Sequence, residues 1–339
     1  MAALEDDIKT ETRVHELEKT CTRLQRQLAS AKAKSDDLVD AVERAAYDAT
    51  MVVGRPAPIP RQKQKAGKGG EEALVLHLTD WQLGKSTHDG SYNSDVCIRR
   101  VHDVVDRVRR ITEVQRADHP VKHCVILFGG DHVEGQGIFP GQAHEVDSSS
   151  YAQLMNASGL MSDVVLSMLE DFDTVEVYSV PGNHGRLGRK GDEERETNLD
   201  NIAYAISRGQ LKDQKRLTWH PHGHWYQHVV VGEYKALLVH GDQIKGFGGT
   251  PAFAIARKCT AWSSGAIPVS FSDVYIGHYH QNLVITLPNG GQVRMTPSTE
   301  SGSQYASEFM ASKGRPGQRL VFVRPDKGTT TSEYMIWLD

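Results

Sequence analysis

Apolar residues recur at alternating steps of three and four along the first 50 residues of the chain. The positions are Val14, Leu17, Cys21, Leu24, Leu28, Ala31, Ser35, Leu38, Val42 and Ala45. This spacing predicts the a/d seam of a coiled coil over about four heptads. We therefore expect residues 1–53 to form a helical coiled-coil arm that joins copies of the chain into a homo-oligomer. Because Cys, Ser and Ala weaken the seam, one solvated helix is the alternative.

The apolar period ends at Gly54. From there to Gly70 the sequence reads GRPAPIPRQKQKAGKGG, in which Pro, Gly and Lys dominate. Such a composition is typical of a segment without regular structure. We expect residues 54–72 to be a flexible linker, whose basic side chains could contact phosphates.

Short apolar runs then alternate with amphipathic stretches up to about residue 261, and the rest of the chain has the pattern of strands alone. Helices are expected at 95–116, 151–170 and 253–261. Strands are expected at 74–78, 123–128, 175–180, 225–231, 234–239, 274–276, 283–287, 292–296, 320–323 and 332–338. Strands alternating with helices and followed by a β-rich tail predict a layered α/β sandwich. We assign residues 73–339 to this one domain.

Composition restricts the function. The chain has 339 residues and a formal net charge of −4, so any affinity for nucleic acid must come from local patches. The four cysteines are scattered and form no CxxC pair, which argues against a disulfide framework or a thiolate zinc site. No apolar run is long enough to cross a bilayer, and the N-terminus lacks the apolar core of a signal peptide. We expect a cytoplasmic protein with no membrane partner.

Polar residues of one chemical kind follow five of the expected strands. The segments are Asp80-Trp81-Gln82, Gly130-Asp131-His132-Val133-Glu134, Gly182-Asn183-His184-Gly185, His240-Gly241-Asp242 and Gly277-His278-Tyr279-His280. Open α/β sheets place their sites at strand ends. Carboxylate, imidazole and amide oxygen together are ligands for divalent ions such as Mn²⁺, Fe²⁺ and Zn²⁺. The pattern predicts a metal site.

These segments resemble the motifs of the calcineurin-like metallophosphoesterase family, which run DxH, GDxxD, GNH(D/E), H and GHxH in that order. All five occur here in the same order and cover roughly residues 73 to 300. The order argues against dinucleotide-binding and P-loop proteins, whose glycine motifs are missing after the first strand. Within the family, the sequence looks most similar to the DNA-repair exonuclease branch.

The resemblance implies a metallophosphoesterase β-sandwich flanked by helices, with two divalent ions, Mn²⁺ first and Fe²⁺ or Zn²⁺ as alternatives. It implies Asp131 as the bridging ligand, and it gives the first ion Asp80, Gln82 and His280. The second ion would be held by Asn183, His240 and His278. His184 would be the catalytic residue outside the ligand set, either stabilising the transition state or protonating the leaving oxygen. Two such ions can activate a water and stabilise both the attacking and the leaving oxygen.

The sequence departs from the family pattern at three positions. Gln82 stands where the family has His, and its amide oxygen is a poorer ligand for a transition metal. Glu134 replaces the second Asp of GDxxD. Gly185 removes the acid that usually follows GNH and could orient His184.

We therefore expect a metal-dependent phosphoesterase that hydrolyses phosphodiester bonds, with a DNA nuclease as the first choice. The basic linker and the KGRPGQR segment at 313–319 could hold a nucleic-acid backbone, although the acidic net charge argues against it. The enzymatic alternatives are a protein phosphatase and a small-molecule or nucleotide phosphodiesterase. The alternative of another class is a coiled-coil interaction protein that carries a degenerate, inactive phosphoesterase fold.

Overall fold

The computed structural model divides the chain into two units, Met1–Ala49 and Thr50–Asp339. It describes Lys19 and Arg23 of the first unit and most of the second. The described ranges of the second unit are 54–61, 67–139, 141–188, 197–221, 224–245, 251–300 and 314–339. The predicted coiled-coil arm lies outside the described residues except for Lys19 and Arg23, and it stays a prediction.

One sheet of this unit has six strands in the order β11-β10-β1-β2-β3-β4. Their bounds are β1 (Glu72–Leu78), β2 (Val121–Phe128), β3 (Thr174–Ser179), β4 (Leu217–Trp219), β10 (Gly317–Arg324) and β11 (Thr329–Trp337). Strands β1 to β4 pair in parallel, and β10 runs antiparallel to both β1 and β11. The parallel pairing brings the carboxyl ends of β1, β2 and β3 to one edge of the sheet.

A second sheet has five strands in the order β5-β6-β7-β9-β8. Their bounds are β5 (Tyr226–Val231), β6 (Tyr234–Val239), β7 (Asp273–Ile276), β8 (Leu283–Thr286) and β9 (Gln292–Met295). The β5–β6 and β8–β9 pairs are antiparallel, whereas β6 and β7 are parallel. The carboxyl ends of β6 and β7 therefore lie together, as do those of the first sheet.

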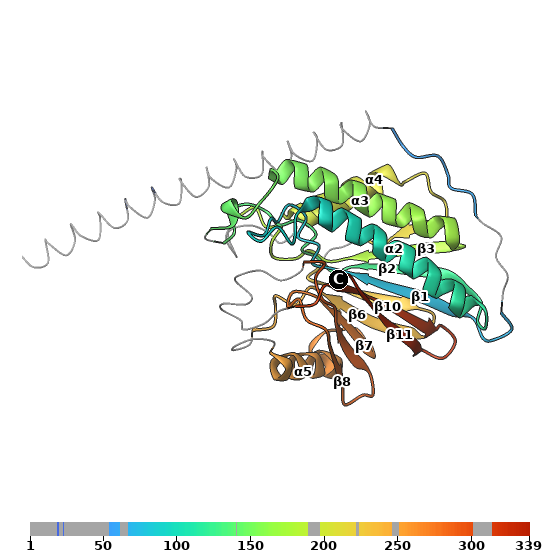
Figure 1. Cartoon of the computed structure of the whole chain (residues 1–339). Coiled ribbons are helices and arrows are strands. Elements are labelled where there is room, and N and C mark those ends of the chain that lie inside the picture. Colours follow the sequence, from blue (N-terminus) through green and yellow to red (C-terminus); the bar gives the residue numbers. More distant parts are fainter. Residues whose placement is uncertain are drawn as a thin grey trace, which may run out of the picture. The chain divides into compact units, whose positions relative to one another are not determined.

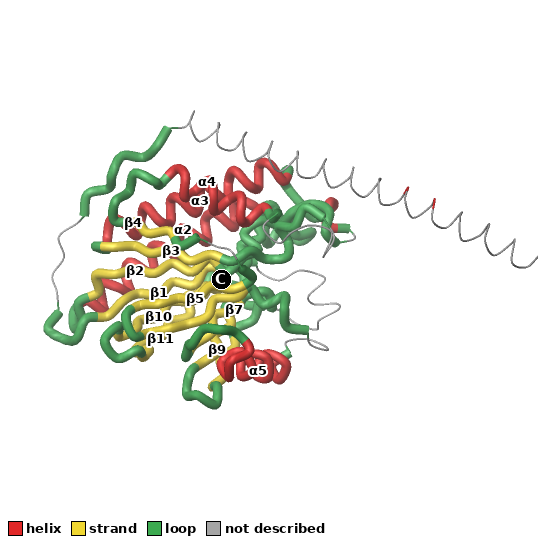
Figure 2. The backbone as a smooth tube through the Cα atoms, turned by 180° about the vertical axis from the view of Figure 1, so that it is seen from behind, coloured by secondary structure: helices red, strands yellow, loops and turns green. Residues whose placement is uncertain are grey.

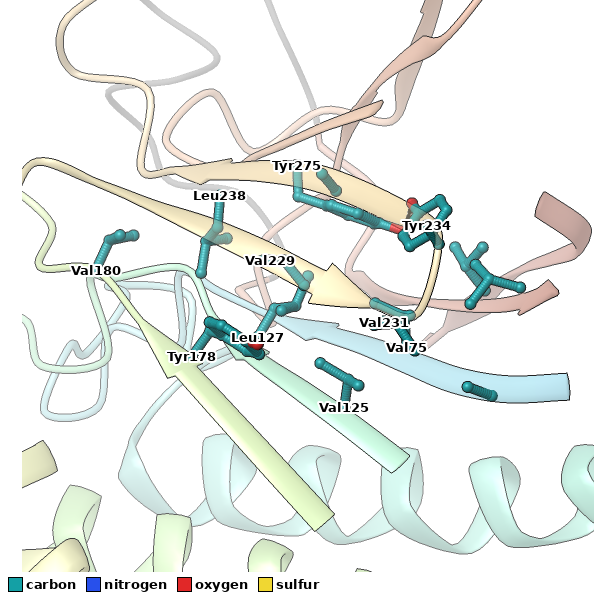
Figure 3. Packing of buried hydrophobic residues seen from close by; sticks show 14 residues of the cluster. Val75, Val125, Leu127, Tyr178, Val180, Val229, Val231, Tyr234, Leu238 and Tyr275 are labelled. Carbon is teal, nitrogen blue, oxygen red and sulfur yellow. Dashed lines mark hydrogen bonds between the residues drawn. The ribbon is translucent and has the colours of Figure 1, made fainter. Parts of the chain in front are cut away.

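The two sheets pack face to face, and the main hydrophobic core lies between them (Figure 3). Val75 of β1 and Val125 of β2 contribute to it from the first sheet, while Leu238 of β6 and Tyr275 of β7 contribute from the second. All four are fully buried. Strand β1 is buried along its whole length because it has neighbouring strands on both sides and a covered face above and below.

Helices cover the outer faces of this sandwich. The helices are α2 (Ser94–Arg116), α3 (Ser150–Asp171), α4 (Leu199–Gln210) and α5 (Ala252–Ala261), with short turns η1 (Gln142–His144) and η2 (Trp262–Ala266). Helices α2, α3 and α4 lie over the six-stranded sheet, and α5 packs on the five-stranded one (Figures 1 and 2). Asn93, Ser149 and Asn198 cap the N-termini of α2, α3 and α4 with their side-chain oxygens. The predicted layered α/β sandwich flanked by helices is confirmed.

Part of the predicted linker is held against this domain. The Arg216 guanidinium donates to the carbonyl of Ile59 at 2.8 Å, and the Gln214 side-chain oxygen accepts from the Ile59 amide at 3.2 Å. Arg61 forms an ion pair with Asp173 at 2.5 Å. Residues 59 and 61 of this segment therefore contact the domain, while the flexible linker 54–72 stays a prediction. No described helix is long and apolar enough to span a membrane.

Candidate metal centre

The five polar segments follow β1, β2, β3, β6 and β7, and their side chains meet beyond the carboxyl ends of these strands. Three strands belong to one sheet and two to the other, so the site is shared by both layers of the sandwich. This arrangement explains why the motifs are spread over about 200 residues of sequence. Each sheet supplies only part of a ligand set, and the sandwich joins the parts.

The backbone is unusual at the predicted ligands. Among the described residues, five non-glycine positions have positive φ: Asp80 at 53°, Gln82 at 45°, Asp131 at 53°, His278 at 68° and His280 at 53°. A non-glycine residue in this region costs free energy and persists where the surrounding structure imposes it, often at functional sites. All five were predicted as metal ligands from the sequence. The local strain therefore marks the same site as the motifs do.

Two motif glycines permit the strand ends to approach closely. A Cβ on Gly182 would lie 2.0 Å from the Asp131 Oδ1, and one on Gly277 would lie 2.3 Å from the Asp80 Oδ2. Neither contact is sterically possible. The glycines of GNH and GHxH are thus needed so that one loop can pack on the carboxylate of another.

Three of the predicted ligands gather around a fourth, Asp131. One ligand atom from each of Asp131, His240 and His278 lies within 4.8 Å of the others. The His240 Nε2 lies 3.0 Å from the Asp131 Oδ2 and 3.2 Å from the Asn183 Oδ1. Its Nδ1 faces the carbonyl of Gly129 at 2.8 Å, which fixes the ring with Nε2 toward the carboxylate. These contacts assemble the predicted second metal position.

The remaining three ligands form a neighbouring group. The His280 Nε2 lies 3.4 Å from the Asp80 Oδ1 and 3.2 Å from the Gln82 Nε2. Both oxygens of Asp80 accept from the His278 amide, at 3.1 and 2.9 Å. The Gln82 Oε1 is buried and has no hydrogen-bond partner among the described residues. Such an orphaned acceptor is costly unless a ligand satisfies it, and a metal cation would do so.

The electrostatics of the centre favour positive charge. Burial lowers the pKa of His240, but the adjacent Asp131 carboxylate outweighs burial and raises that pKa to about 10. Burial and the charge of His240 together lower the pKa of His278 to about 4. Only one imidazole of this pair is thus readily protonated beside the carboxylate. A buried carboxylate that stabilises a cation this strongly provides a suitable environment for divalent ions.

His184 occupies the position expected of a catalytic group beside the ligands. Its amide donates to the Asp131 Oδ1 at 2.7 Å, and its Nε2 lies 3.4 Å from the Gln82 Nε2. Its Nδ1 lies 3.1 Å from the buried Glu134 Oε2. Burial lowers the pKa of His184, whereas the Glu134 and Asp131 charges raise it to about 9. A protonated imidazole aimed at the centre can donate a proton to a leaving oxygen.

This geometry accounts for two departures from the family pattern. Glu134, in place of the second Asp of GDxxD, is the acid that orients His184. Gly185 has no room for a side chain, since a Cβ there would lie 2.4 Å from the Asn198 Oδ1. Asn198 also donates to the carbonyl of Gly182 at 2.9 Å. A side chain after His184 is therefore excluded by the loop that Asn198 anchors.

Asp200 is a structural residue of the site that the sequence analysis missed. Its fully buried carboxylate accepts from the amides of Asp131 at 2.8 Å, His132 at 3.0 Å and Gly182 at 2.9 Å. Burial and the charge of Asp131 raise its pKa to about 6. Asp200 thus fastens the GD loop to the GN loop. The available signal was an acidic residue in the first turn of a helix capped by Asn198.

Comparison of the sequence with protein-family models and with curated proteins finds no match. Several solved structures are similar to the chain. One is Vps29 from Entamoeba histolytica in complex with zinc, with 12% identity, a TM-score of 0.35 and coverage of 78% of this chain and 99% of that one. Another is a dimetal phosphatase from Danio rerio, with 10% identity, a TM-score of 0.36 and coverage of 78% and 99%. A phosphatase from Mycoplasma pneumoniae has 10% identity, a TM-score of 0.33 and coverage of 79% and 93%.

These likenesses carry no argument about activity, which rests on the chain's own residues. The two-sheet fold and the meeting of the five motif segments at the carboxyl ends of their strands agree with what the resemblance to calcineurin-like metallophosphoesterases implies. The predicted fold is confirmed. The DNA-repair exonuclease branch is not confirmed and stays a prediction.

Proposed function

We propose that the chain is a divalent-metal-dependent phosphoesterase that cleaves phosphodiester bonds, with DNA as its first substrate class. The observation that supports catalysis is His184, held by Glu134 at 3.1 Å and placed against the ligand Asp131. A site that only bound metal would not need a protonated, oriented imidazole beside its ligands. Two divalent ions bound there would supply Lewis-acid activation of the phosphoryl group and of the attacking water.

The residues themselves have distinct tasks in this proposal. The Asp131 carboxylate lies beside His240, and the Asp131 carbonyl accepts from the Gln82 amide at 2.9 Å. Asp131 would be shared by both ions, as the resemblance implies. His184 would protonate the oxygen that leaves, and Glu134 keeps its ring oriented and its pKa high. Gln82 would complete the first metal position through its buried Oε1. Mn²⁺ is the ion we expect, because an amide oxygen next to carboxylates suits a harder ion better than a softer one.

Phe139 favours a substrate with an aromatic or nucleoside leaving group. Its side chain is 42% exposed, and its ring centroid lies 5.1 Å from that of His184. The buried Gln142 side chain accepts from the Ile138 amide at 2.8 Å and holds this loop in place. A group leaving from the oxygen that His184 protonates would pass beside this ring, and a base could stack on it. This supports a nucleic-acid diester over a phosphoprotein.

One set of assays tests the proposal. The purified chain with Mn²⁺ is offered bis-p-nitrophenyl phosphate, p-nitrophenyl phosphate, and single- and double-stranded DNA. Diester and DNA hydrolysis are expected to exceed monoester hydrolysis. Asp131→Asn should abolish turnover, and His184→Gln should keep the metal while losing roughly 10²–10⁴-fold in rate. Asp103→Asn, on the exposed side of α2, is the matched control and should be fully active.

Several outcomes would overturn parts of this assignment. Near-normal activity of Asp131→Asn excludes the shared-ligand role, and loss of metal from His184→Gln makes His184 a ligand. A preference for the monoester favours the phosphatase alternative. The replacement of a ligand His by Gln82 favours the second candidate, an inactive phosphoesterase fold kept for binding. Absence of hydrolysis of every substrate by metal-loaded protein supports that candidate.

A further inference from the structure

Lys85 and Glu300 form a buried ion pair next to the metal centre. The Lys85 Nζ lies 3.2 Å from the Glu300 Oε1, and the two side chains are only 10% and 1% exposed. Removing two charges from water is expensive, and a buried pair of this kind contributes little net stability. Neither residue belongs to any of the five motifs. The pair therefore calls for an explanation other than stability.

The second oxygen of Glu300 faces a predicted metal ligand. The Glu300 Oε2 lies 3.6 Å from the Nδ1 of His280. The other ring nitrogen of His280 points to Asp80 and Gln82, at 3.4 and 3.2 Å. The carboxylate thus lies behind the imidazole, on the side opposite the ligand atom. A carboxylate in this place fixes the ring orientation and raises the basicity of the ligating nitrogen.

The pair is also built into the segments that carry the other ligands. The Ser298 hydroxyl donates to the carbonyl of Asp80 at 2.6 Å and accepts from the amide of Glu300 at 2.8 Å. The amide of Lys85 donates to the carbonyl of Gln82 at 3.0 Å, which closes a turn starting at that ligand. Glu300 and Lys85 are thereby tied to Asp80 and Gln82 respectively. The geometry of the pair and that of the first metal position are fixed together.

Lys85 has a further electrostatic connection across the site. Burial lowers its pKa, but the charges of Glu300 and, next, of Glu134 raise it above the usual value. Glu134 is the carboxylate that holds His184. One buried ammonium thus balances two carboxylates, each of which contacts a histidine of the site.

We propose that the Lys85–Glu300 pair is a positioning device for the first metal ion. Glu300 holds His280 with its Nε2 toward the ion, and Lys85 holds Glu300 in place. The reason lies in Gln82, which supplies a weak amide ligand where an imidazole is expected, so that the first position depends more heavily on His280. This inference uses the metal centre of the proposed function and does not depend on which bond the centre cleaves.

The variant Glu300→Gln tests the inference by metal binding. Its matched control is Glu72→Gln, another buried glutamate, which accepts from the Gln115 Nε2 at 2.6 Å at the opposite end of β1. Metal-free protein is titrated with Mn²⁺ by calorimetry. The two bound Mn²⁺ ions are followed by electron paramagnetic resonance. In Glu300→Gln we expect one of two ions to bind about 10- to 100-fold more weakly, with the other unchanged. Glu72→Gln should bind both ions normally.

A double-mutant cycle tests the part played by Lys85. Because Lys85 acts through Glu300, the double variant Lys85→Met/Glu300→Gln should bind the first ion no more weakly than Glu300→Gln alone. Additive effects would overturn this coupling. Normal binding of both ions by Glu300→Gln, or equal weakening of both, would overturn the inference as a whole. If the wild-type chain binds two ions and hydrolyses nothing, the proposed function fails while the positioning role stands.

Discussion

At the scale of single residues, Gln82 is the clearest difference between this site and the family pattern. Its amide oxygen can coordinate, but an imidazole binds Mn²⁺, Fe²⁺ or Zn²⁺ better. The first ion should therefore be the weaker of the two and should be lost first on dialysis. We expect Gln82→His to shift the Mn²⁺ activation curve to lower concentration. A metal titration of both proteins, followed by activity and calorimetry, makes the comparison.

The same titration distinguishes metal binding by Gln82 from a role in substrate binding. Its Nε2 lies 3.4 Å from the His184 Nε2, so the side chain also borders the place of the leaving group. If Gln82 contacts substrate and no metal, the histidine variant will keep the wild-type metal curve and change its preference among substrates. An unchanged curve removes Gln82 from the ligand set.

The candidate ligands could be proposed from sequence because ligand chemistry restricts the residue type at each motif. Asp80, Asp131 and His240 each follow an apolar strand, and this placement is visible without a structure. Glu300 and Asp200 could not be predicted in this way. Each is an ordinary acidic residue until folding brings it to the centre; Asp200 reaches its partner Asp131 across 69 residues of sequence.

At the scale of elements, hydrophobic periodicity predicts almost every strand and three of the four α-helices in the described part of the second unit. The exceptions have physical reasons. Helix α4 has a period of three and four in Leu199, Ile202, Ala203 and Ile206, but it follows a long polar stretch and was not recognised. Strand β4 has three residues, too few for alternation to be visible. Helix α4 matters for the site, because Asp200 lies in its first turn.

The start of α4 should contribute strongly to the stability of the domain. Asp200→Ala would leave three buried amides without an acceptor, those of Asp131, His132 and Gly182. Each unsatisfied group costs about 1–3 kcal/mol, so we expect a loss of roughly 3 kcal/mol or more in the free energy of unfolding. Urea unfolding of the metal-free wild type and variant measures this loss in the free energy of unfolding.

Two further variants make this test specific. Asp103→Ala, on the exposed side of α2, should change the free energy of unfolding by less than about 0.5 kcal/mol. Asp200→Asn keeps one acceptor oxygen and should lie between the alanine variant and the wild type. Wild-type stability of Asp200→Ala would mean that the two loops are held together by other contacts.

At the scale of the whole molecule, the predicted linker makes contacts with the domain that composition does not indicate. The Pro-rich segment at 54–61 looks like a free linker in sequence, yet Arg216 and Gln214 bind its backbone. Composition could not reveal this because the partners are distant in sequence. A shortened chain that starts near residue 71 would lose these contacts. Residues 54–339 are the better unit for comparison with the full chain.

The coiled-coil arm leads to the last prediction. If the seam at residues 14 to 45 pairs with a second copy, the full chain should be an oligomer and residues 54–339 should have a lower oligomeric state. Multi-angle light scattering at two concentrations measures both. Leu24→Asp, on the seam, should lower the mass of the full chain, whereas Arg23→Asp, next to it and off the seam, should not. Because the ligands begin at Asp80, residues 54–339 should keep their activity on small diesters. A monomeric state of both chains would mean that residues 1–53 do not associate.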